Sequence, residues 1–237
     1  MYFHLTSKCN FSCAHCCYSY GNGKQGKDMP FELFEKAIEK YIDLINENNN
    51  FITLGGGETT LHKDFWKILN YSMSKGKVWL ATNGSTTKTA LTLCELARKG
   101  HVAIALSQDE WHDPIDPEVI ERFSEGLKEY DCDYYTEYYH PDRGKEGSYD
   151  LREVRSVKVP IRGGRAATMD TLREGCPCPG LQVKVDGSLY TCGCDDAPKI
   201  GTIDDGIKEE KYRYYNIFEG CHKGENPLMR EEIKNEL

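Results

Sequence analysis

The chain has 237 residues, of which 39% are hydrophobic, and this is enough for one full domain with a small appendage. Its formal net charge of −8 argues against a nucleic-acid substrate and against binding to an anionic membrane. The sequence has no apolar run long enough to cross a bilayer and no secretory signal at its N-terminus, so we expect a cytoplasmic protein.

Short strand-like runs alternate with helical periodicity over the first 165 residues. The expected strands, in chain order, are residues 2–6, 51–54, 77–81, 101–106, 133–139 and 157–161. Helices are expected between them: Pro30 opens the first, residues 61–69 carry the second, residues 87–99 the third, and Asp116 caps the fourth. This alternation predicts a parallel sheet with right-handed crossovers. Six strands are too few for a closed eight-stranded barrel, so the predicted fold class is α/β, a partial (β/α)6 TIM-like barrel formed by residues 1–165.

The composition changes after residue 165. Cysteine, glycine and proline become frequent, and a hairpin-like pair of short strands is expected at residues 181–185 and 189–191. A polar segment of this size buries too little apolar surface to be stable without further support. We therefore interpret residues 166–237 as a small cysteine-rich extension that a metal site holds together.

Cysteine is unusually frequent in this chain. The total of eleven is odd, and nine of these cysteines fall into two groups, one from Cys9 to Cys17 and one from Cys176 to Cys221. In a chain without a secretory signal, clustered cysteines indicate metal binding rather than disulfide bonds. The two remaining thiols, Cys94 and Cys132, are expected to pack in the interior.

The first group follows the first expected strand directly. Cys9, Cys13 and Cys16 have the spacing C-x3-C-x2-C, and three thiolates this close can bind one [4Fe–4S] cluster. Three ligands for four irons leave one iron open to a further ligand. The position after a strand places this group at the C-terminal mouth of the expected barrel. A structural zinc site is the alternative, with His15 or Cys17 as the fourth ligand.

Together with the motifs after the next strands, this segment resembles the signature of the radical SAM (S-adenosylmethionine) superfamily. Residues 55–58, Gly-Gly-Gly-Glu, resemble the family's Gly-Gly-Glu motif, which holds the amino group of SAM, although Thr59 stands where the family usually has proline. Residues 82–84, 107–109 and 162–165 follow later strands and resemble positions beside the SAM pocket. The resemblance implies a SAM site formed by Gly56, Gly57, Glu58, Thr82, Asn83, Ser107 and Arg162.

The second cysteine group resembles the auxiliary-cluster extension of the radical SAM enzymes called twitch or SPASM proteins. Cys176, Gly187 and Cys192 form a C-x10-G-x4-C pattern around the expected hairpin. The resemblance implies one auxiliary [4Fe–4S] cluster with Cys178 or Cys194 as its fourth ligand, and the whole candidate set is Cys176, Cys178, Cys192, Cys194 and Cys221. Twitch proteins usually end in a close cysteine pair, whereas only Cys221 is present here. A zinc ribbon is the alternative.

The resemblance also implies a reaction. A radical SAM enzyme cleaves SAM reductively to a deoxyadenosyl radical, which abstracts a hydrogen atom from the substrate, with electrons from a donor such as flavodoxin or ferredoxin. An auxiliary cluster near the substrate favours a net oxidation, either a dehydrogenation or a cross-link, so we expect an oxidoreductase.

The substrate is less well defined by the sequence. Because the chain begins directly on the first strand, we expect no N-terminal peptide-recognition domain, which favours a small molecule or a partner-delivered peptide. Maturation of a ribosomal peptide (RiPP) is the next hypothesis, and a non-enzymatic zinc-binding interaction module is the third. Trp111 and His112 follow Asp109 and could line a substrate pocket, although loop packing explains them equally well.

Overall fold

The computed structural model describes residues 1–21, 25–47, 51–131, 135–160, 163–169, 181–190 and 199–207. Its elements, in chain order, are β1 (Tyr2–Thr6), α1 (Phe31–Glu47), β2 (Ile52–Gly56), the 3-10 helix η1 (Thr59–Leu61), α2 (Phe65–Lys75), β3 (Val78–Thr82), α3 (Thr87–Arg98), β4 (Ala103–Ser107), α4 (Pro117–Ser124), β5 (Lys128–Asp131), β6 (Tyr135–Tyr139), β7 (Arg152–Val157), the 3-10 helix η2 (Gly164–Thr168), β8 (Gln182–Val183), β9 (Ser188–Tyr190), β10 (Lys199–Thr202) and β11 (Gly206–Ile207). No helix in these ranges is long and apolar enough to cross a membrane.

All the described strands belong to one sheet. Their order is β11-β10-β9-β8-β1-β2-β3-β4-β7-β6-β5, and the six strands from β8 to β7 in this order run parallel to their neighbours. Both flanks are antiparallel, β9 to β11 on one side and β6 with β5 on the other. Because β11 and β5 are separate edges, the sheet is open, and its curvature into a partial barrel remains a prediction.

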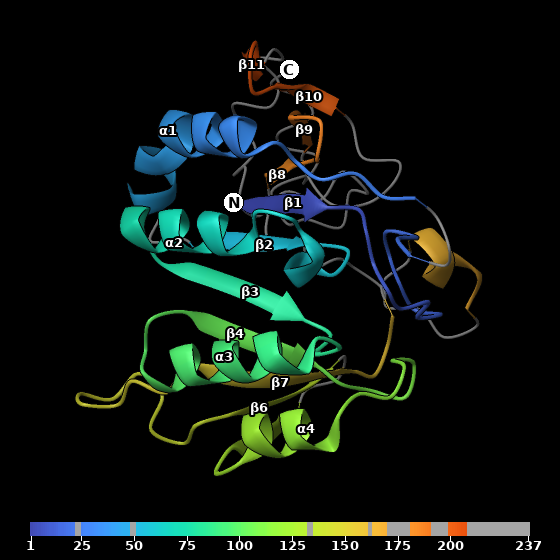
Figure 1. The fold of residues 1–237 in the computed structure, drawn as a ribbon, viewed down its shortest axis with the longest axis vertical. Coiled ribbons are helices and arrows are strands. Elements are labelled where there is room, and N and C mark those ends of the chain that lie inside the picture. The colour runs from blue at the N-terminus through green and yellow to red at the C-terminus, as the bar shows by residue number, and fades with distance from the viewer. Residues whose placement is uncertain are drawn as a thin grey trace, which may run out of the picture.

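The helices follow the parallel strands. Figure 1 shows α1, α2 and α3 beside the strands, while the strand arrows β1 and β3 point to the end of the molecule that carries η2 and the loop after β1. One face of α1 is buried, with Phe34, Ile38 and Ile45 fully shielded from solvent. Asp116 caps α4 as expected, because its side chain accepts a hydrogen bond from the Glu118 amide.

Two of the expected parallel strands are placed differently. The fifth, at 133–139, is β6, and it runs antiparallel because only residues 132–134 separate it from β5, too few for a crossover connection. The sixth is not at 157–161 but at Arg152–Val157. The sequence of β7 begins with Arg152 and Glu153, which are buried although charged. Periodicity of apolar residues therefore gives no sign of where this strand starts.

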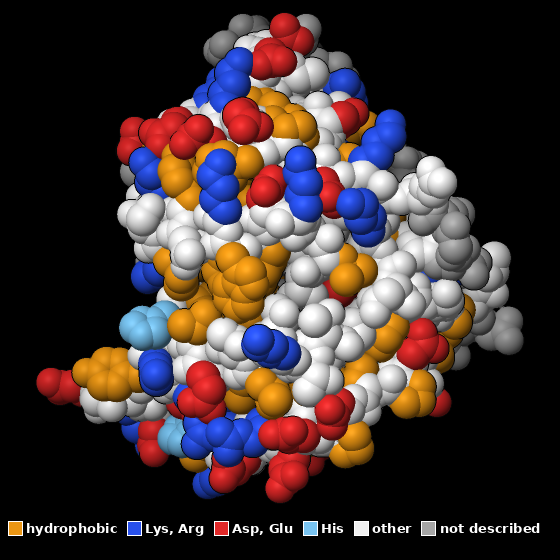
Figure 2. Space-filling view, in the orientation of Figure 1, with side chains coloured by type: hydrophobic (Ala, Val, Ile, Leu, Met, Phe, Trp, Pro, Cys, Tyr) orange, Lys and Arg blue, Asp and Glu red, His pale blue; other side chains and the backbone are white. Residues whose placement is uncertain are grey.

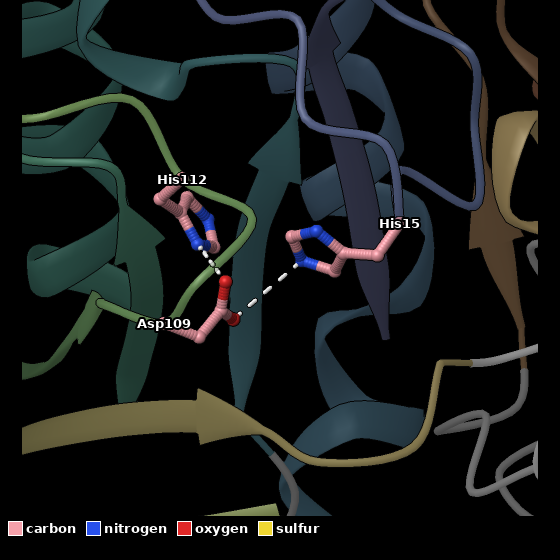
Figure 3. A group of neighbouring side chains, drawn as sticks. All are labelled: His15, Asp109 and His112. Atoms are coloured by element: carbon pink, nitrogen blue, oxygen red, sulfur yellow. Dashed lines mark hydrogen bonds and ion pairs between the residues drawn. The ribbon is translucent and has the colours of Figure 1, made fainter. Parts of the chain in front are cut away.

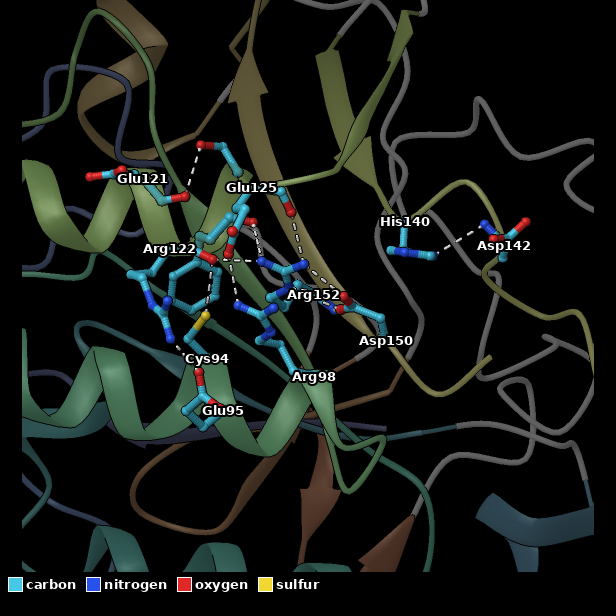
Figure 4. Close-up of polar contacts among 12 residues, drawn as sticks. Cys94, Glu95, Arg98, Glu121, Arg122, Glu125, His140, Asp142, Asp150 and Arg152 are labelled. Carbon is cyan, nitrogen blue, oxygen red and sulfur yellow. Dashed lines mark hydrogen bonds and ion pairs between the residues drawn. The ribbon is translucent and has the colours of Figure 1, made fainter. Parts of the chain in front are cut away.

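A buried arginine closes the corner between β7 and α4 (Figure 4). Arg152, 2% exposed, donates to the carbonyl oxygens of Arg122 and Glu125 at 2.6 and 2.9 Å and pairs with Asp150 at 2.7 Å. These bonds satisfy carbonyl groups that the end of a helix leaves without partners. The thiol of Cys94 donates to the Arg122 carbonyl as well, which confirms its expected place in the interior.

Charged side chains of both signs cover the face of the molecule seen in Figure 2. Acidic and basic groups are interspersed, and apolar side chains gather near the middle of this face. Trp66 of α2 is among the exposed large hydrophobic residues, with 40% of its surface accessible. This face therefore has no continuous field of positive charge of the kind that binds nucleic acid.

Candidate active site

A cavity of about 450 Å³ opens where the parallel strands end. It lies beside the loop after β1, the turn after β2, the ends of β3, β4 and β7, and the loop that follows β4. Its walls are formed by Tyr2, Cys9, Phe11, Cys13, His15, Cys16, Cys17, Tyr18, Tyr20, Gly55, Gly56, Gly57, Glu58, Ala81, Thr82, Asn83, Ser107, His112, Arg155, Val157 and Val159. The volume suits a ligand of cofactor size.

The loop after β1 is held by hydrogen bonds from two other segments. The amide of Glu58 donates to the Lys8 carbonyl at 2.9 Å, and the amide of Arg165 donates to the Cys16 carbonyl at 3.0 Å. Gly57 allows the close approach, because a Cβ atom there would lie 2.0 Å from the Lys8 carbonyl oxygen. The turn after β2 and the helix η2 therefore fix the backbone that carries the cysteines.

Cys9, Cys13 and Cys16 all reach the cavity, and each is half-buried. Burial is the main cause that raises the pKa of the Cys13 thiol to about 12, and burial likewise raises the pKa of Cys9. Such thiols keep their protons at neutral pH unless a metal replaces them. Three thiols on one loop, facing a cavity and joined by no disulfide, therefore suit a metal cluster better than any use as free thiols.

The glycine turn after β2 brings backbone close to the same cavity. Gly56 has a φ of +125°, and a Cβ atom there would lie 2.2 Å from the Thr6 carbonyl oxygen. No side chain fits at this position, so Gly56 and Gly57 leave a smooth backbone surface against which a ligand can lie. Their position in the cavity agrees with the SAM contact expected for them, which stays a prediction.

The carboxylate of Glu58 joins two strand ends. It is 2% exposed and accepts hydrogen bonds from the Thr60 amide and hydroxyl, the Thr82 hydroxyl at 2.8 Å and the Asn83 amide at 2.7 Å. Three of these bonds fall on Oε1, so Oε2 keeps acceptor capacity. Glu58 thus has a structural function that sequence reasoning missed, in addition to the expected pairing with the SAM ammonium.

The other expected SAM contacts lie at successive strand ends. Thr82 and Asn83 end β3 and Ser107 ends β4, and all three line the cavity. Arg162 lies outside the described residues. The basic side chain that does line the cavity is Arg155, which stands opposite Ser107 in the pairing of β4 with β7 and bonds Glu137 at 2.5 Å. No sequence pattern pointed to Arg155, because the strand that carries it was expected at residues 157–161 and lies at Arg152–Val157.

A second polar group consists of His15, Asp109 and His112 (Figure 3), of which His15 and His112 line the cavity. The Asp109 carboxylate accepts from His112 Nδ1 at 2.7 Å and from the amides of Trp111 and Val157, and His15 Nε2 lies 3.7 Å from it. His15 therefore faces Asp109, which disfavours it as the fourth ligand of a cysteine-bound zinc. Asp109 connects the cysteine loop, the loop after β4 and the end of β7.

A family model supports what the geometry indicates. Residues 3–150, more than half of the chain, match the model of the Radical SAM superfamily. The chain belongs to the radical SAM superfamily. Members of this superfamily are enzymes that use SAM and a [4Fe–4S] cluster, and the cavity of this radical SAM protein presents three cysteines and a glycine turn of the matching type.

Several curated proteins are similar in sequence to this radical SAM protein. Mycofactocin maturase MftC of Mycolicibacterium smegmatis is 33% identical over 107 residues, which is 44% of this chain and 26% of the relative. The putative peptide biosynthesis protein YydG of Bacillus subtilis is 24% identical over 216 residues, or 79% of this chain and 67% of that protein. The chain thus matches about a quarter of the length of MftC.

Solved structures show the same fold over nearly the whole chain. BtrN, determined in complex with AdoMet and 2-DOIA, has a TM-score of 0.54 at 16% identity and covers 98% of this chain and 84% of its own. Streptococcus suis SuiB bound to S-adenosylmethionine has a TM-score of 0.53 at 10% identity, covering 96% and 70%. At these identities the likeness is one of fold.

The C-terminal candidate ligands of this radical SAM protein lie outside the described residues. They are Cys176, Cys178, Cys192, Cys194 and Cys221. The hairpin expected between them is present as β8 and β9, which pair antiparallel. β8 also pairs with β1, with Tyr2 opposite Gln182. The hairpin therefore joins the sheet beside β1, the strand that precedes the cysteine loop, while the auxiliary cluster and the boundary at residue 165 stay predictions.

Proposed function

We propose that this radical SAM enzyme carries out a net oxidation of a peptide, either a dehydrogenation or a cross-link. The observation that carries the proposal is the joint placement of three half-buried cysteines and a side-chain-free glycine turn on one cavity. The similarity to MftC, named a mycofactocin maturase, and to YydG, named a putative peptide biosynthesis protein, favours a peptide over a free metabolite.

The residues would divide the work as follows. Cys9, Cys13 and Cys16 would hold the cluster, leaving one iron open toward the cavity. With SAM bound, that cluster supplies the electron that cleaves a sulfur–carbon bond of SAM to give a radical able to remove a hydrogen atom from the substrate. The backbone of Gly56 and Gly57 would receive the amino-acid end of SAM, and the free acceptor of Glu58 Oε2 would pair with its ammonium group.

The remaining expected contacts would complete the SAM site. Thr82, Asn83 and Ser107 would line its other side, and Arg162 would reach its carboxylate. Arg155 already stands on the cavity wall and is a second candidate for an anionic group of SAM or substrate. The cavity walls would also keep water from the reacting groups.

An auxiliary [4Fe–4S] cluster would accept the electron that the substrate radical must lose in an oxidation. Its ligands would come from Cys176, Cys178, Cys192, Cys194 and Cys221. We place the enzyme in the cytoplasm with a flavodoxin or ferredoxin as electron donor, because both clusters require reducing conditions. The experiment for this cluster is iron analysis of the variant without the first three cysteines: about four irons per chain should remain. Zinc in their place would support the zinc ribbon.

The test of the SAM site is reductive SAM cleavage by anaerobically reconstituted protein. The wild type should release deoxyadenosine and methionine, and the variant with Cys9, Cys13 and Cys16 replaced by alanine should release neither. Cys94→Ala is the matched control, since that buried thiol lies in the α3–α4 corner, and it should keep full cleavage. Deoxyadenosine from the triple variant would contradict the assignment.

The substrate class is tested by mass spectrometry. Candidate peptides encoded beside the gene and a set of small metabolites are incubated with reduced protein and SAM. Loss of the mass of two hydrogen atoms from a peptide supports the proposal. The same loss from a metabolite instead would show that the substrate is a small molecule and not a peptide.

A further inference from the structure

Three side chains with nitrogen or oxygen ligand atoms gather beside the cavity, apart from the cysteines. His15 comes from the cysteine loop, while Asp109 and His112 come from the loop after β4 (Figure 3). Each offers one ligand atom, and these atoms all lie within 4.8 Å of one another. The spacing is small enough for all three atoms to contact a single ion after modest movement of two imidazole rings.

The surroundings of this group are those of a metal site rather than of a surface ion pair. The side chains of Asp109 and His112 are only 2% and 9% exposed, and that of His15 is 13% exposed. The Asp109 carboxylate is fixed by the amides of Trp111 and Val157, so its position does not depend on the histidines. The Nδ1 atom of His15 is buried without a hydrogen-bond partner among the described residues. Hydrogen bonds within the chain therefore leave His15 incompletely satisfied.

We propose that His15, Asp109 and His112 form a second metal site, for a divalent first-row cation such as Zn²⁺ or Fe²⁺. Two imidazoles and one carboxylate are a ligand set that both ions accept. Three protein ligands leave at least one coordination position open, and His15 and His112 place it at the cavity. The proton that joins His112 Nδ1 to Asp109 would be replaced by the ion.

An open coordination position beside the expected SAM pocket gives the ion a function. A bound cation there can hold an oxygen or nitrogen atom of a second ligand in the cavity and fix its orientation. This inference depends on the side chains of three residues and not on the proposed oxidation. It can therefore fail while the proposed oxidation stands, and the reverse also holds.

The experiment uses Zn²⁺ as probe on reconstituted protein whose cysteines already carry iron. Zinc and iron per chain are measured by mass spectrometry after removal of loosely bound metal. The wild type should hold about one zinc more than His112→Gln at equal iron content. Zinc affinity should fall at least tenfold in this variant, since even outer-shell changes at metal sites cost about 10- to 100-fold. His101→Gln, at an exposed histidine, is the matched control and should bind zinc like the wild type.

X-ray absorption at the zinc edge identifies the ligands directly. Nitrogen and oxygen at about 2.0–2.1 Å support the site, whereas sulfur at about 2.3 Å would show zinc on the cysteines and overturn it. Asp109→Asn serves as a second variant that removes the charge and should lose zinc as His112→Gln does; its single amide oxygen can keep only one of the two bonds from the Trp111 and Val157 amides. Equal zinc in wild type and His112→Gln, with deoxyadenosine formation intact, would overturn the metal site and leave the proposed function standing.

Discussion

Two corners of the molecule are held by an arginine that donates to backbone carbonyl groups, and they differ in what balances its charge. Arg152, at the start of β7, pairs with Asp150 and is almost completely buried. Arg165, in η2 beside the cavity, donates from Nε to the Cys13 carbonyl at 3.0 Å and from Nη1 to the Tyr20 carbonyl at 2.7 Å. In the part of the chain that the structure describes, no carboxylate pairs with Arg165.

The difference indicates what each corner is for. The charge of Arg152 is neutralised within the corner, so its bonds serve only to fix α4 against β7. The charge of Arg165 acts instead on the cysteine loop: burial raises the pKa of the Cys9 thiol, and the Arg165 guanidinium opposes that rise. A cation next to thiols favours their deprotonated, metal-binding form. The first corner is complete in itself, whereas we expect the second to be completed by the proposed cluster.

Replacement of Arg152 by methionine should have the largest effect on stability. The change leaves the Asp150 carboxylate without its arginine partner and removes the arginine donors from the Arg122 and Glu125 carbonyl groups. Breaking a buried pair of this kind costs about 3–5 kcal/mol in the free energy of unfolding. Urea unfolding measures it. The exposed pair of Arg98 with Glu125 in the same corner is the control, and Arg98→Met should cost about 0.2–1 kcal/mol. Equal losses in both variants would contradict the distinction.

Arg165→Met should show that the two corners have different roles. It removes two hydrogen bonds from a charged donor to partly exposed carbonyl groups, which are worth about 1.5–3 kcal/mol together after screening by solvent. The main expected result is a fall in iron bound after reconstitution, since the cysteine loop loses both its brace and its positive charge. Iron per folded chain is the measurement. Arg152→Met should keep its iron wherever it is folded, and the idea fails if Arg165→Met keeps it as well.

His4 shows a third way of placing an ionisable group, which is to keep it uncharged. Its side chain is fully buried on β1 with Nε2 2.6 Å from Gln182 Oε1, and burial lowers its pKa from 6.5 to about 3, with the Lys184 charge adding to this. The folded state therefore binds the proton less readily than the unfolded state. The stabilisation is complete above pH 6.5 and declines as the pH falls toward 3, by about 1.4 kcal/mol per pH unit.

The measurement is urea unfolding at pH 7.5 and at pH 5.5 for wild type and His4→Gln. The loss of stability between the two pH values should be smaller in His4→Gln, because the variant has no imidazole to protonate. His101→Gln is the control for an exposed histidine and should follow the wild type. Parallel pH curves for wild type and His4→Gln would show that His4 is not kept neutral by the fold.

The same contrast explains which parts of the fold can be predicted from the sequence alone. The parallel strands β1 to β4 and their helices were predictable, because apolar residues there follow helical or strand periods with clear caps and turns. The strand β7 was misplaced because Arg152 and Glu153 are buried by pairing rather than by being apolar. β5 escaped prediction because all four of its residues are exposed. Charge pairing is a tertiary property, and no local pattern reveals it.

The candidate site divides in a similar way. The cysteine spacing and the glycine turn are local patterns, and their positions at strand ends were enough to bring them to one cavity. Arg155 and the contact between His15 and Asp109 depend on strand order, which places segments far apart in the sequence beside each other. The acceptor bonds of Glu58 depend on the same order, since they join β2 to β3.

The smallest effect on stability is expected for an ion pair that is exposed to solvent. Lys36 of α1 lies 2.5 Å from Asp204 in the turn between β10 and β11, but the two side chains are 55% and 72% exposed. Water screens such a pair, so Lys36→Ala should lower the free energy of unfolding by only about 0.2–1 kcal/mol, and less at high salt. Lys40, one helical turn later, donates to the Ile203 carbonyl at 2.7 Å in a partly buried hydrogen bond and should matter more when replaced by alanine. Urea unfolding at low and high salt compares the two variants. If Lys36→Ala cost as much as Arg152→Met, exposure would not govern these pairs, and the contrast between a self-contained corner and an open one would lose its physical basis.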